Sequence, residues 1–330
     1  MRILYFTPYF NQPRGNSTTS KRIVHFLQNY GIHTSVFPYL EKEPWFLPST
    51  ETIDVIHILH ATRFLSWAQE NHFSLERPYI VTMGGTDINV DLQAPLANDV
   101  SELLQQAAKI TVFTPDAKQK VIRLNSDWAN KIHVIPQSAW LPWNIGEPEQ
   151  FEQPNILLPA GLRPIKDVLH TLPALDDLYE SYPNLQFKIV GANLHADVYD
   201  EVNKASHTRP WFTYAGVVPF EVMTHWYQEA NIVVNSSVSE GQSLAVMEAL
   251  AIGRPVIARK NAANEELIQH NETGWLYRSM EQFKEAVFSI MNDSFHRGQV
   301  IQAGKQWVGA HASPHNEARQ YIELYKRAGN

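Results

Sequence analysis

The stretch Asn231–Ala258, NIVVNSSVSEGQSLAVMEALAIGRPVIA, contains a strand, a polar loop, a helix and a second strand. The first strand, Ile232–Asn235, is apolar up to its last residue, and the loop Ser236–Gln242 that follows contains a glycine. A helix is predicted over Ser243–Ile252 because a glycine and a proline follow it at once, and Pro255–Ala258 is the next strand. This order is typical of a parallel α/β sheet, in which ligands bind at the carboxyl ends of the strands.

Two glutamates frame this loop and helix. Glu240 lies in the loop and Glu248 in the otherwise apolar helix, with seven residues between them. Carboxylates hold hydroxyl groups through charge-assisted hydrogen bonds, so one could bind one end of a polyhydroxyl ligand and the other a diol further along. The helix start at Ser243 offers N–H groups that suit a phosphate. By itself, however, a residue such as Glu248 would more often face the solvent.

Short apolar runs alternate with helical stretches along the whole chain, which favours parallel sheets covered by helices on both faces. In the first half the predicted strands are Ile3–Thr7, Thr34–Pro38, Val55–Leu59, Tyr79–Met83, Ile110–Phe113 and His133–Ile135. In the second half they are Ile156–Ala160, Phe187–Gly191, Phe212–Ala215, Ile232–Asn235 and Pro255–Ala258. The predicted helices are Thr18–Tyr30, Ala97–Ala107, Asp167–Tyr182, Phe220–Ala230 and Ser243–Ile252. Because the alternation occurs twice in 330 residues, the sequence predicts two Rossmann-like, doubly wound α/β domains.

The two halves meet in Pro136–Pro154, a stretch rich in proline, glutamine and glutamate that has the composition of a linker. Its Trp140 and Trp143 are expected to pack between domains, with an acceptor platform or a membrane contact as the alternative. Near the C-terminus, apolar side chains recur at the spacing of an amphipathic helix. The expected domains are therefore residues 1–145 and 146–312, with a C-terminal helix over 313–330 that packs back toward the first domain.

Composition and charge exclude several classes of protein. The 27 Lys and Arg against 34 Asp and Glu give a net charge of -7, which disfavours sequence-independent nucleic-acid binding. The chain has no cysteine, which excludes disulfides, cysteine-bound zinc, iron–sulfur clusters and a cysteine nucleophile. No apolar run approaches the roughly 20 residues of a membrane span, and the N-terminal run is shorter than in a signal peptide. We therefore expect a cytoplasmic protein without integral membrane association.

Further polar residues follow other predicted strands. Arg163 and Lys166 come after one of them, where two cations could neutralise a diphosphate, although surface salt bridges are the simpler alternative. His60 and Asp87 each follow a strand in the first half, and either could contact a substrate; a structural histidine and a helix N-cap are the alternatives. His57 and His60 form an H-x-x-H pattern, but residues three apart on a strand face opposite sides, so no metal site is predicted.

These motifs resemble those of the retaining glycosyltransferases of family GT4, which have the GT-B fold. The two glutamates before GRPVIA, the sequence GLRPIKD (161–167) and the PRGN loop (13–16) are similar to motifs of that family in the same order. Four motifs are similar to the group containing glycosyltransferase 1 domain-containing protein 1: GNSTTSKR (15–22), GGTDIN (84–89), GLRPIKD (161–167) and VVNSSVSEG (233–241). The first two also resemble motifs of the bacterial selenosugar synthases. One position departs from the family: Gly84 stands near the place of a histidine that contacts the transferred sugar.

The resemblance implies two domains facing a central cleft, the first binding an acceptor and the second a nucleotide sugar such as UDP-N-acetylglucosamine. It implies transfer with retention by front-face attack, in which the leaving phosphate helps to deprotonate the acceptor, and it implies neither a metal nor another cofactor. Glu240 would hold sugar hydroxyls and Glu248 the ribose diol. The implied donor-binding residues are Gly15, Asn16, Arg163, Lys166, Val217, Val218, Glu240, Gly241, Gln242, Ser243, Leu244 and Glu248. The implied catalytic residues are Glu240, Arg163, Lys166, Asp87 and His60.

Other functions on the same fold stay open. One is a transferase that forms selenosugars or thiosugars, and another is a nucleotide-sugar-binding protein without activity, which the glycine at position 84 favours. A sugar-nucleotide 2-epimerase is disfavoured by the spacing of the two glutamates. A soluble small molecule or a glycan is expected as the acceptor rather than a lipid, because the first half has no Lys/Arg-rich amphipathic helix.

Overall fold

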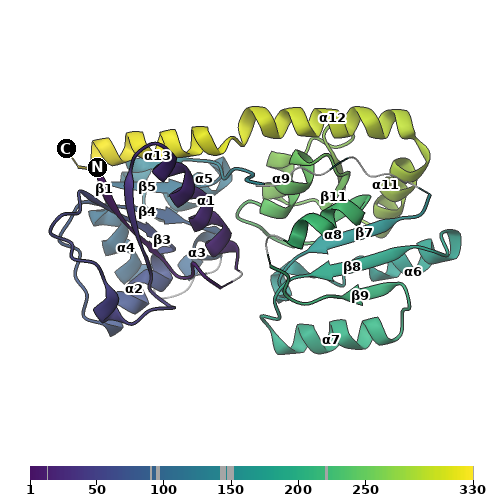
Figure 1. Cartoon of the computed structure of the whole chain (residues 1–330), viewed down its shortest axis with the longest axis horizontal. Helices are drawn as coiled ribbons and strands as arrows, with labels where there is room; N and C mark the ends of the chain where they lie inside the picture. Colours follow the sequence, from purple (N-terminus) through teal and green to yellow (C-terminus); the bar gives the residue numbers. More distant parts are fainter. Residues whose placement is uncertain are drawn as a thin grey trace. The chain divides into compact units, whose positions relative to one another are not determined.

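The computed structural model describes residues 1–12, 14–89, 91–93, 97–141, 146, 152–219 and 222–329 (Figure 1). The chain forms two compact units, one of Met1–Ser138 with Ser313–Asn330 and the other of Ala139–Ala312. The first unit therefore ends at Ser138, before the expected boundary at residue 145, and the C-terminal segment belongs to it. Each unit contains one six-stranded sheet.

The first sheet has the strand order β2-β1-β3-β4-β5-β6, and all neighbouring strands in it are parallel. Its strands are β1 (Arg2–Thr7), β2 (His33–Pro38), β3 (Val55–Leu59), β4 (Tyr79–Met83), β5 (Lys109–Val112) and β6 (Ile132–Val134). The α-helices of the unit are α1 (Gly15–Asn29), α2 (Ala61–Glu70), α3 (Gly85–Asn89), α4 (Ala97–Gln106), α5 (Pro115–Leu124) and α13 (Pro314–Ala328). The strand order reverses between β1 and β3, and doubly wound sheets bind ligands at such a reversal.

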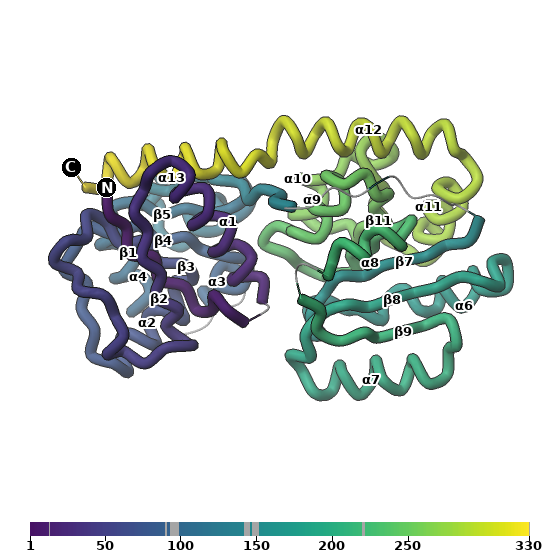
Figure 2. The backbone as a smooth tube through the Cα atoms, viewed as in Figure 1, coloured from purple at the N-terminus to yellow at the C-terminus, as the bar shows by residue number. Residues whose placement is uncertain are grey.

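The second sheet has the order β12-β11-β10-β7-β8-β9 and is also parallel throughout. Its strands are β7 (Asn155–Pro159), β8 (Gln186–Val190), β9 (Phe212–Tyr214), β10 (Ile232–Asn235), β11 (Val256–Arg259) and β12 (Trp275–Tyr277). Its helices are the 3-10 helix η4 (Pro164–Lys166), α6 (Leu172–Ser181), α7 (Ala196–His207), α8 (Met223–Glu229), α9 (Leu244–Ala251), α10 (Ala262–Leu267), α11 (Met280–Asn292) and α12 (Ser294–His311). The reversal point of this sheet lies between β7 and β10. Figure 2 shows the neighbouring strands β7, β8 and β9 of this sheet running side by side.

The prediction of two doubly wound parallel sheets is confirmed, and the ends of each predicted strand lie within one residue of those observed. The predicted helix over Asp167–Tyr182 is wrong at its start, because Asp167 has a positive φ of 42° that no α-helix accommodates, and α6 begins only at Leu172. The helix predicted from Thr18 begins earlier, at Gly15. Strand β12 and several helices were not predicted, namely α2, α3, α5, α7, α11 and α12.

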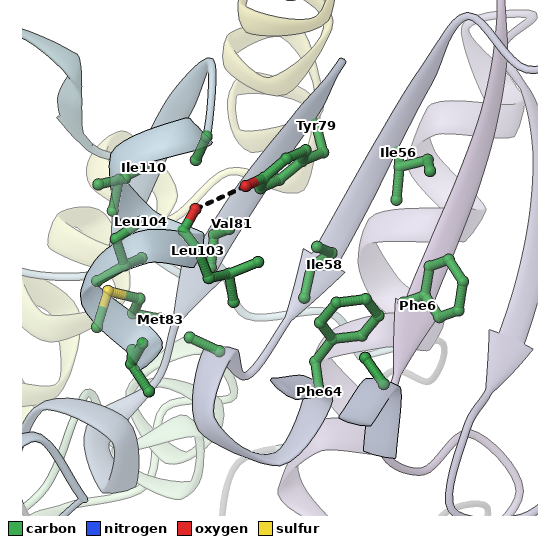
Figure 3. Close-up of a cluster of buried hydrophobic side chains, with 14 of the residues drawn as sticks. Phe6, Ile56, Ile58, Phe64, Tyr79, Val81, Met83, Leu103, Leu104 and Ile110 are labelled. Carbon is green, nitrogen blue, oxygen red and sulfur yellow. Dashed lines mark hydrogen bonds between the residues drawn. The ribbon is translucent and has the colours of Figure 1, made fainter. Parts of the chain in front are cut away.

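Apolar residues of the strands form a core against both faces of each sheet, as expected for parallel strands covered by helices. On one face of the first sheet, Phe6 and Ile56 pack in the same cluster as Phe64 of α2 (Figure 3). Tyr79 belongs to this cluster too, and its hydroxyl donates a 2.7 Å hydrogen bond to the carbonyl of Leu103 (Figure 3). The polar end of Tyr79 is therefore satisfied inside the core.

The other face of the first sheet is covered in part by α13, which packs beside α1. Tyr321 and Tyr325 of α13 are fully buried there. The ring of His57, from β3, bridges the hydroxyls of Tyr325 (2.6 Å from Nδ1) and Thr82 (2.7 Å from Nε2). Burial lowers the pKa of His57 to about 3, so the ring in this bridge is neutral.

The expected linker begins inside a buried polar network of the first unit. Arg22 of α1 donates to both oxygens of Glu317 in α13, at 2.7 and 3.0 Å. Gln137 accepts a hydrogen bond from Arg22 at 3.3 Å, and Ser138 donates one to Glu317. Because both are buried and bonded, these first linker residues are part of the folded unit.

Trp140, the first of the two linker tryptophans, is partly buried in the second unit. Trp143 lies outside the described residues. Among the helices that the structure describes, none combines the length and the apolar character needed to cross a membrane.

Candidate functional site

In the second unit, the segments that follow β7 and β10 meet at the reversal point of the sheet. Lys166, at the end of η4, places its ammonium nitrogen 2.5 Å from Glu240 Oε1. The backbones are tied as well: Ser236 Oγ donates to the carbonyl of Lys166 (2.9 Å), and the amide of Val238 donates to the carbonyl of Ile165 (3.0 Å). The fold thus brings together two predicted site residues that are distant in sequence.

The carboxylate of Glu240 is almost enclosed, with 9% of its side chain exposed. Ser237 Oγ (2.7 Å) and Asn235 Nδ2 (3.2 Å) donate to the same oxygen as Lys166. Burial by itself raises the pKa of Glu240, but the Lys166 charge and these hydrogen bonds hold it below its usual value. Glu240 is therefore an ionised group held in a defined orientation.

Asn235, the last residue of β10, connects this loop to the start of α9. Its Nδ2 donates to Ser243 Oγ at 3.0 Å, and its Oδ1 accepts from Asn264 Nδ2 at 3.1 Å. Ser243 is the N-cap of α9, and its hydroxyl accepts from the amide of Val246. The sequence-based site omits Asn235 and Ser237. A polar residue at the end of an apolar strand was the available signal, but the partners of Asn235 lie in three separate segments.

Glu248 lies on α9, partly buried, and accepts a 2.9 Å hydrogen bond from the hydroxyl of Tyr227. Tyr227 is fully buried, and its burial together with the Glu248 charge raises its pKa well above the usual value. Tyr227 therefore remains protonated and donates to the carboxylate. Glu248 is not an exposed residue on the solvent face of the helix.

The structure also describes the other predicted donor residues of the second unit. Arg163 directly precedes η4 and is partly buried. Val217 and Val218 follow β9, which is the outer strand of the sheet and lies two strands from β7. Three further predicted residues are partly buried. Gly241 and Gln242 end the Glu240 loop, and Leu244 is the first residue of α9.

A further cation, Arg259, closes the turn that follows η4. Its Nη1 lies 2.6 Å from Asp167 Oδ2 and 3.4 Å from the carbonyl of Ser236. Arg259 ends β11, so a third strand end contributes to the Lys166 loop. This residue, too, was missed from the sequence.

In the first unit, the structure brings together His60 and Asp87. His60 follows β3, and its Nδ1 lies 2.6 Å from Asp87 Oδ1. Asp87 is in α3 rather than at an N-cap, and its Oδ2 accepts from the amides of Ala61 (3.1 Å) and Gly84 (3.3 Å). Both side chains are buried, with 4% of His60 and none of Asp87 exposed.

Asp91 lies close to this pair. Thr62 Oγ1 donates to Asp91 Oδ2 at 2.5 Å and lies 3.3 Å from His60 Nδ1. His60, Asp87 and Asp91 each place one potential metal-ligating atom within 4.8 Å of the others. His57 is not part of this cluster, because its two ring nitrogens contact Tyr325 and Thr82.

Gly15 and Asn16 begin α1, after the loop that follows β1. Gly15 is exposed, and a Cβ there would meet nothing within 4 Å. The preceding loop is held by Glu41, whose carboxylate accepts from the backbone amides of residues 10–12. Pro13, the first residue of the PRGN motif, lies outside the described residues.

Comparison with known sequences gives matches for the second unit and for the whole chain. Residues 153–293 match the family described as glycosyl transferases group 1. Over 341 aligned positions the chain is 26% identical to glycosyltransferase 1 domain-containing protein 1 of Xenopus tropicalis, covering 98% of this chain and 97% of that protein. It is 23% identical to the D-inositol 3-phosphate glycosyltransferase of Corynebacterium urealyticum, over 66% of this chain and 49% of that protein.

Comparison with solved structures extends over nearly the whole chain. Anabaena HepE in complex with UDP and glucose is similar with a TM-score of 0.78 at 15% identity, covering 99% of both chains. Sucrose-phosphate synthase from Thermosynechococcus elongatus is similar with a TM-score of 0.75 at 16% identity, over 99% of this chain and 98% of that one. The chain therefore has the GT-B fold of two Rossmann-like units, and its residues 153–293 match the family of the glycosyl transferases group 1.

Proposed function

We propose that this protein is a glycosyltransferase that moves a sugar from a UDP-sugar to a hydroxyl group of a soluble acceptor. The observation that carries the proposal is the contact between Lys166 and Glu240 at the reversal point of the second sheet. A fixed carboxylate beside a cation, at the edge where such sheets bind ligands, suits a sugar linked to a diphosphate.

The parts of the donor are assigned along this edge. Lys166, with Arg163 just before η4, faces the diphosphate and stabilises the negative charge that develops as it leaves. Glu240 accepts hydrogen bonds from sugar hydroxyls, and the start of α9 at Ser243 receives a phosphate. Glu248, which lies further along α9, binds the ribose diol.

The stereochemistry and the metal requirement follow the family resemblance. We propose transfer with retention, as in the GT4 glycosyltransferases, and a donor complex that forms without a divalent cation. The positive charges of Arg163 and Lys166 take the place of a metal ion at the diphosphate. The loop Gly216–Val218 would cover the nucleotide base, and Gly15 with Asn16 are donor-binding residues by the same resemblance.

The identity of the nucleotide is supported by similar structures. HepE of Anabaena has been solved with UDP and with UDP-glucose. UDP-glucose and UDP-N-acetylglucosamine are therefore the first donors to test. A selenosugar-forming reaction on the same donor and an inactive binding protein are the alternatives, and a transfer assay separates the latter from an enzyme. We place the reaction in the cytoplasm.

The test compares two glutamate variants by calorimetric titration of UDP in the presence of EDTA and by sugar transfer. If Glu248 binds the ribose, Glu248→Gln loses a charged acceptor worth about 1.5–3 kcal/mol, or about ten- to a hundredfold in UDP affinity. If Glu240 contacts only the sugar, Glu240→Gln leaves UDP affinity nearly intact and lowers transfer.

Glu201→Gln is the matched control, because Glu201 is exposed on α7, and it should match the wild type in both assays. An equal loss of UDP affinity in Glu240→Gln and Glu248→Gln would show that the assignment along the ligand is wrong. A strict requirement for Mg²⁺ or Mn²⁺ in UDP binding would contradict the metal-free donor site.

A further inference from the structure

The side-chain amide of Asn235, at the carboxyl end of β10, uses all four of its hydrogen-bonding positions. Its nitrogen donates to Glu240 Oε1 at 3.2 Å and to Ser243 Oγ at 3.0 Å. Its oxygen accepts from Asn264 Nδ2 at 3.1 Å and from the backbone amide of Ser237 at 3.2 Å. An asparagine side chain offers two N–H donors and two oxygen lone pairs, so this amide is fully bonded.

The neighbours of this amide permit only one orientation. The carboxylate of Glu240 is ionised and can only accept, and the backbone amide of Ser237 can only donate. A turned amide would place its oxygen against the carboxylate and its nitrogen against two N–H donors. Asn235 is only 7% exposed, so water cannot make up for such a loss. The direction of each hydrogen bond at Asn235 therefore follows from its surroundings.

Asn264 of α10, which holds the oxygen of Asn235, is itself fully buried. Its nitrogen also donates to the carbonyl of Arg259 at 2.8 Å, whereas no described residue donates to its oxygen. A buried acceptor without a donor destabilises a folded protein, and an apolar side chain of the same shape would avoid that loss. Packing alone therefore does not account for an amide here, but the two hydrogen bonds of its nitrogen do.

Ser243, the second acceptor of the Asn235 amide, keeps a hydrogen for which the described part of the chain offers no acceptor. Its oxygen accepts from Asn235 and from the backbone amide of Val246, which uses both of its lone pairs. The hydroxyl hydrogen therefore points away from both donors, at the start of α9. Since Ser243 is buried, this hydrogen needs an acceptor within the site, and a phosphate oxygen of the proposed donor is one.

Asn235 acts on the orientation of Glu240 rather than on its charge. Burial raises the pKa of Glu240, and the charge of Lys166 is the main influence that lowers it. Lys166 and Ser237 both lie closer to Oε1 than Asn235 does, at 2.5 and 2.7 Å. The amide of Asn235 adds a donor from a third direction to the same oxygen, which restricts rotation of the carboxylate.

We propose that Asn235 is a positioning residue that holds the carboxylate of Glu240 and the hydroxyl of Ser243 in one fixed arrangement. The inference rests on the proposed function, which assigns these two groups to the sugar and to a phosphate of the donor. One planar amide joins the two groups, so the protein sets their separation before the donor binds. Asn235 thereby favours a ligand in which a hydroxyl-bearing ring is linked directly to a phosphate.

The first experiment measures the affinity for UDP, UDP-glucose and UDP-N-acetylglucosamine by calorimetry, and the release of UDP from both sugar nucleotides. Asn235→Ala should lower UDP release and sugar-nucleotide affinity by about ten- to a hundredfold, because a charged group loses its orientation. The affinity for UDP alone should fall by only about two- to tenfold, since it depends on the Ser243 bond and not on Glu240.

Asn235→Asp separates hydrogen bonding from packing. Aspartate has the shape of asparagine and keeps an oxygen for Asn264, but it cannot donate to Glu240 or to Ser243. This variant should be impaired at least as strongly as Asn235→Ala. If Asn235→Asp binds and releases the sugar nucleotides like the wild type, the side chain only fills space and the proposal is overturned.

Asn231→Ala is the matched control. Asn231 is buried directly before β10, at the other end of the strand, and its side chain bonds to the backbones of Gln153 and Asn155. Thermal unfolding should show a loss of stability in Asn231→Ala as in Asn235→Ala. The control should nevertheless keep the wild-type release of UDP and the wild-type ratio of UDP affinity to sugar-nucleotide affinity.

A double-mutant cycle shows whether Asn235 acts through Glu240. Asn235→Ala should lower UDP release by a much smaller factor in the Glu240→Ala background than in the wild type, because the group that it orients is gone. Equal factors in the two backgrounds overturn the proposal.

Failure of the proposed function gives a different result. A wild type that binds neither UDP nor either sugar nucleotide contradicts that function, and the positioning role fails with it. A wild type that binds and cleaves a sugar nucleotide, together with Asn235→Ala and Asn235→Asp variants that do so equally well, overturns only the role of Asn235.

Discussion

At the scale of single residues, the two histidines at β3 differ in the hydrogen bonds that their ring nitrogens make. Both nitrogens of His57 are hydrogen-bonded within the core, and burial keeps its ring neutral by lowering its pKa. His60, three residues on, has one nitrogen close to the Asp87 carboxylate and one that no described residue bonds. By this criterion His57 is a structural residue, whereas the hydrogen bonds of the described residues leave one nitrogen of His60 unused.

The neutral state of His57 predicts how stability depends on pH. The pKa of His57 is about 3 in the folded protein, whereas the ordinary histidine value of 6.5 applies to the unfolded chain. As pH falls, the unfolded chain therefore binds a proton at this residue before the folded protein does. The contribution of His57 is complete above pH 6.5 and is lost as pH falls from there toward 3. Between pH 6.5 and about 4.5 this amounts to roughly 2 kcal/mol of unfolding free energy.

His57→Gln should therefore lower stability at neutral pH, because one of two buried hydrogen bonds is lost, but should reduce the loss on acidification by this amount. Urea unfolding at a series of pH values measures both effects. His33→Gln, at an exposed position, serves as the control and should keep the wild-type pH dependence. Parallel curves for wild type and His57→Gln would refute the neutral assignment.

At the scale of elements, the position of α9 depends on the helix that packs over it. Gly304 of α12 faces α9: a Cβ at this position would lie 2.9 Å from Leu250 Cδ2 and 2.9 Å from the backbone oxygen of Thr273. The leucine side chain can yield, but the backbone oxygen cannot move without disturbing the segment before β12. α12 and α9 can therefore approach this closely only because residue 304 has no side chain.

Gly304→Ala should destabilise the second unit by about 1–3 kcal/mol through overpacking, and it should weaken UDP binding because α9 is displaced. Gly298→Ala in the same helix is the matched control, since a Cβ there meets nothing within 4 Å and alanine favours the helix. Thermal unfolding with and without UDP measures both variants. If Gly304→Ala were as stable as Gly298→Ala, the close approach of the two helices would not be required.

The sequence predicted elements well where local chemistry decides them. Val55–Leu59 and Ile232–Asn235 are buried apolar runs that end at polar residues, and their bounds match β3 and β10. The start of α6 was wrong because the left-handed turn at Asp167 depends on contacts with Arg259, which is distant in sequence. The same limit applies to the site: His60 and Asp87 were each predicted singly, but their contact, and the bonds of Asn235, arise only from the folded sheet.

At the scale of the whole molecule, the two units differ in whether one or two segments of the chain form them. The second unit is the continuous segment Ala139–Ala312, whereas the first needs Ser313–Asn330 as well. The C-terminal helix α13 covers part of one face of the first sheet and pairs Glu317 with the buried Arg22. Breaking such a buried pair leaves an uncompensated charge and costs about 3–5 kcal/mol.

Deleting residues 313–330 should therefore unfold the first unit and leave the second able to bind UDP. Thermal unfolding should show the loss of one transition, and UDP should still stabilise the remaining one. Adding the 313–330 peptide should restore the lost transition, which controls for damage to the second unit. A truncated protein whose first sheet still melts as in the wild type would contradict this dependence on α13.

The late position of α13 also has a consequence for synthesis. A ribosome must translate the whole of residues 139–312 before it reaches the segment that closes the first sheet. At about 5–20 residues per second this takes roughly ten to thirty seconds. During that interval the part of the apolar sheet face that α13 covers stays exposed, and exposed apolar surface favours aggregation. A chain that ends inside the second unit lacks Glu317, the partner of the buried Arg22, and we expect its first unit to be less stable than in the full chain.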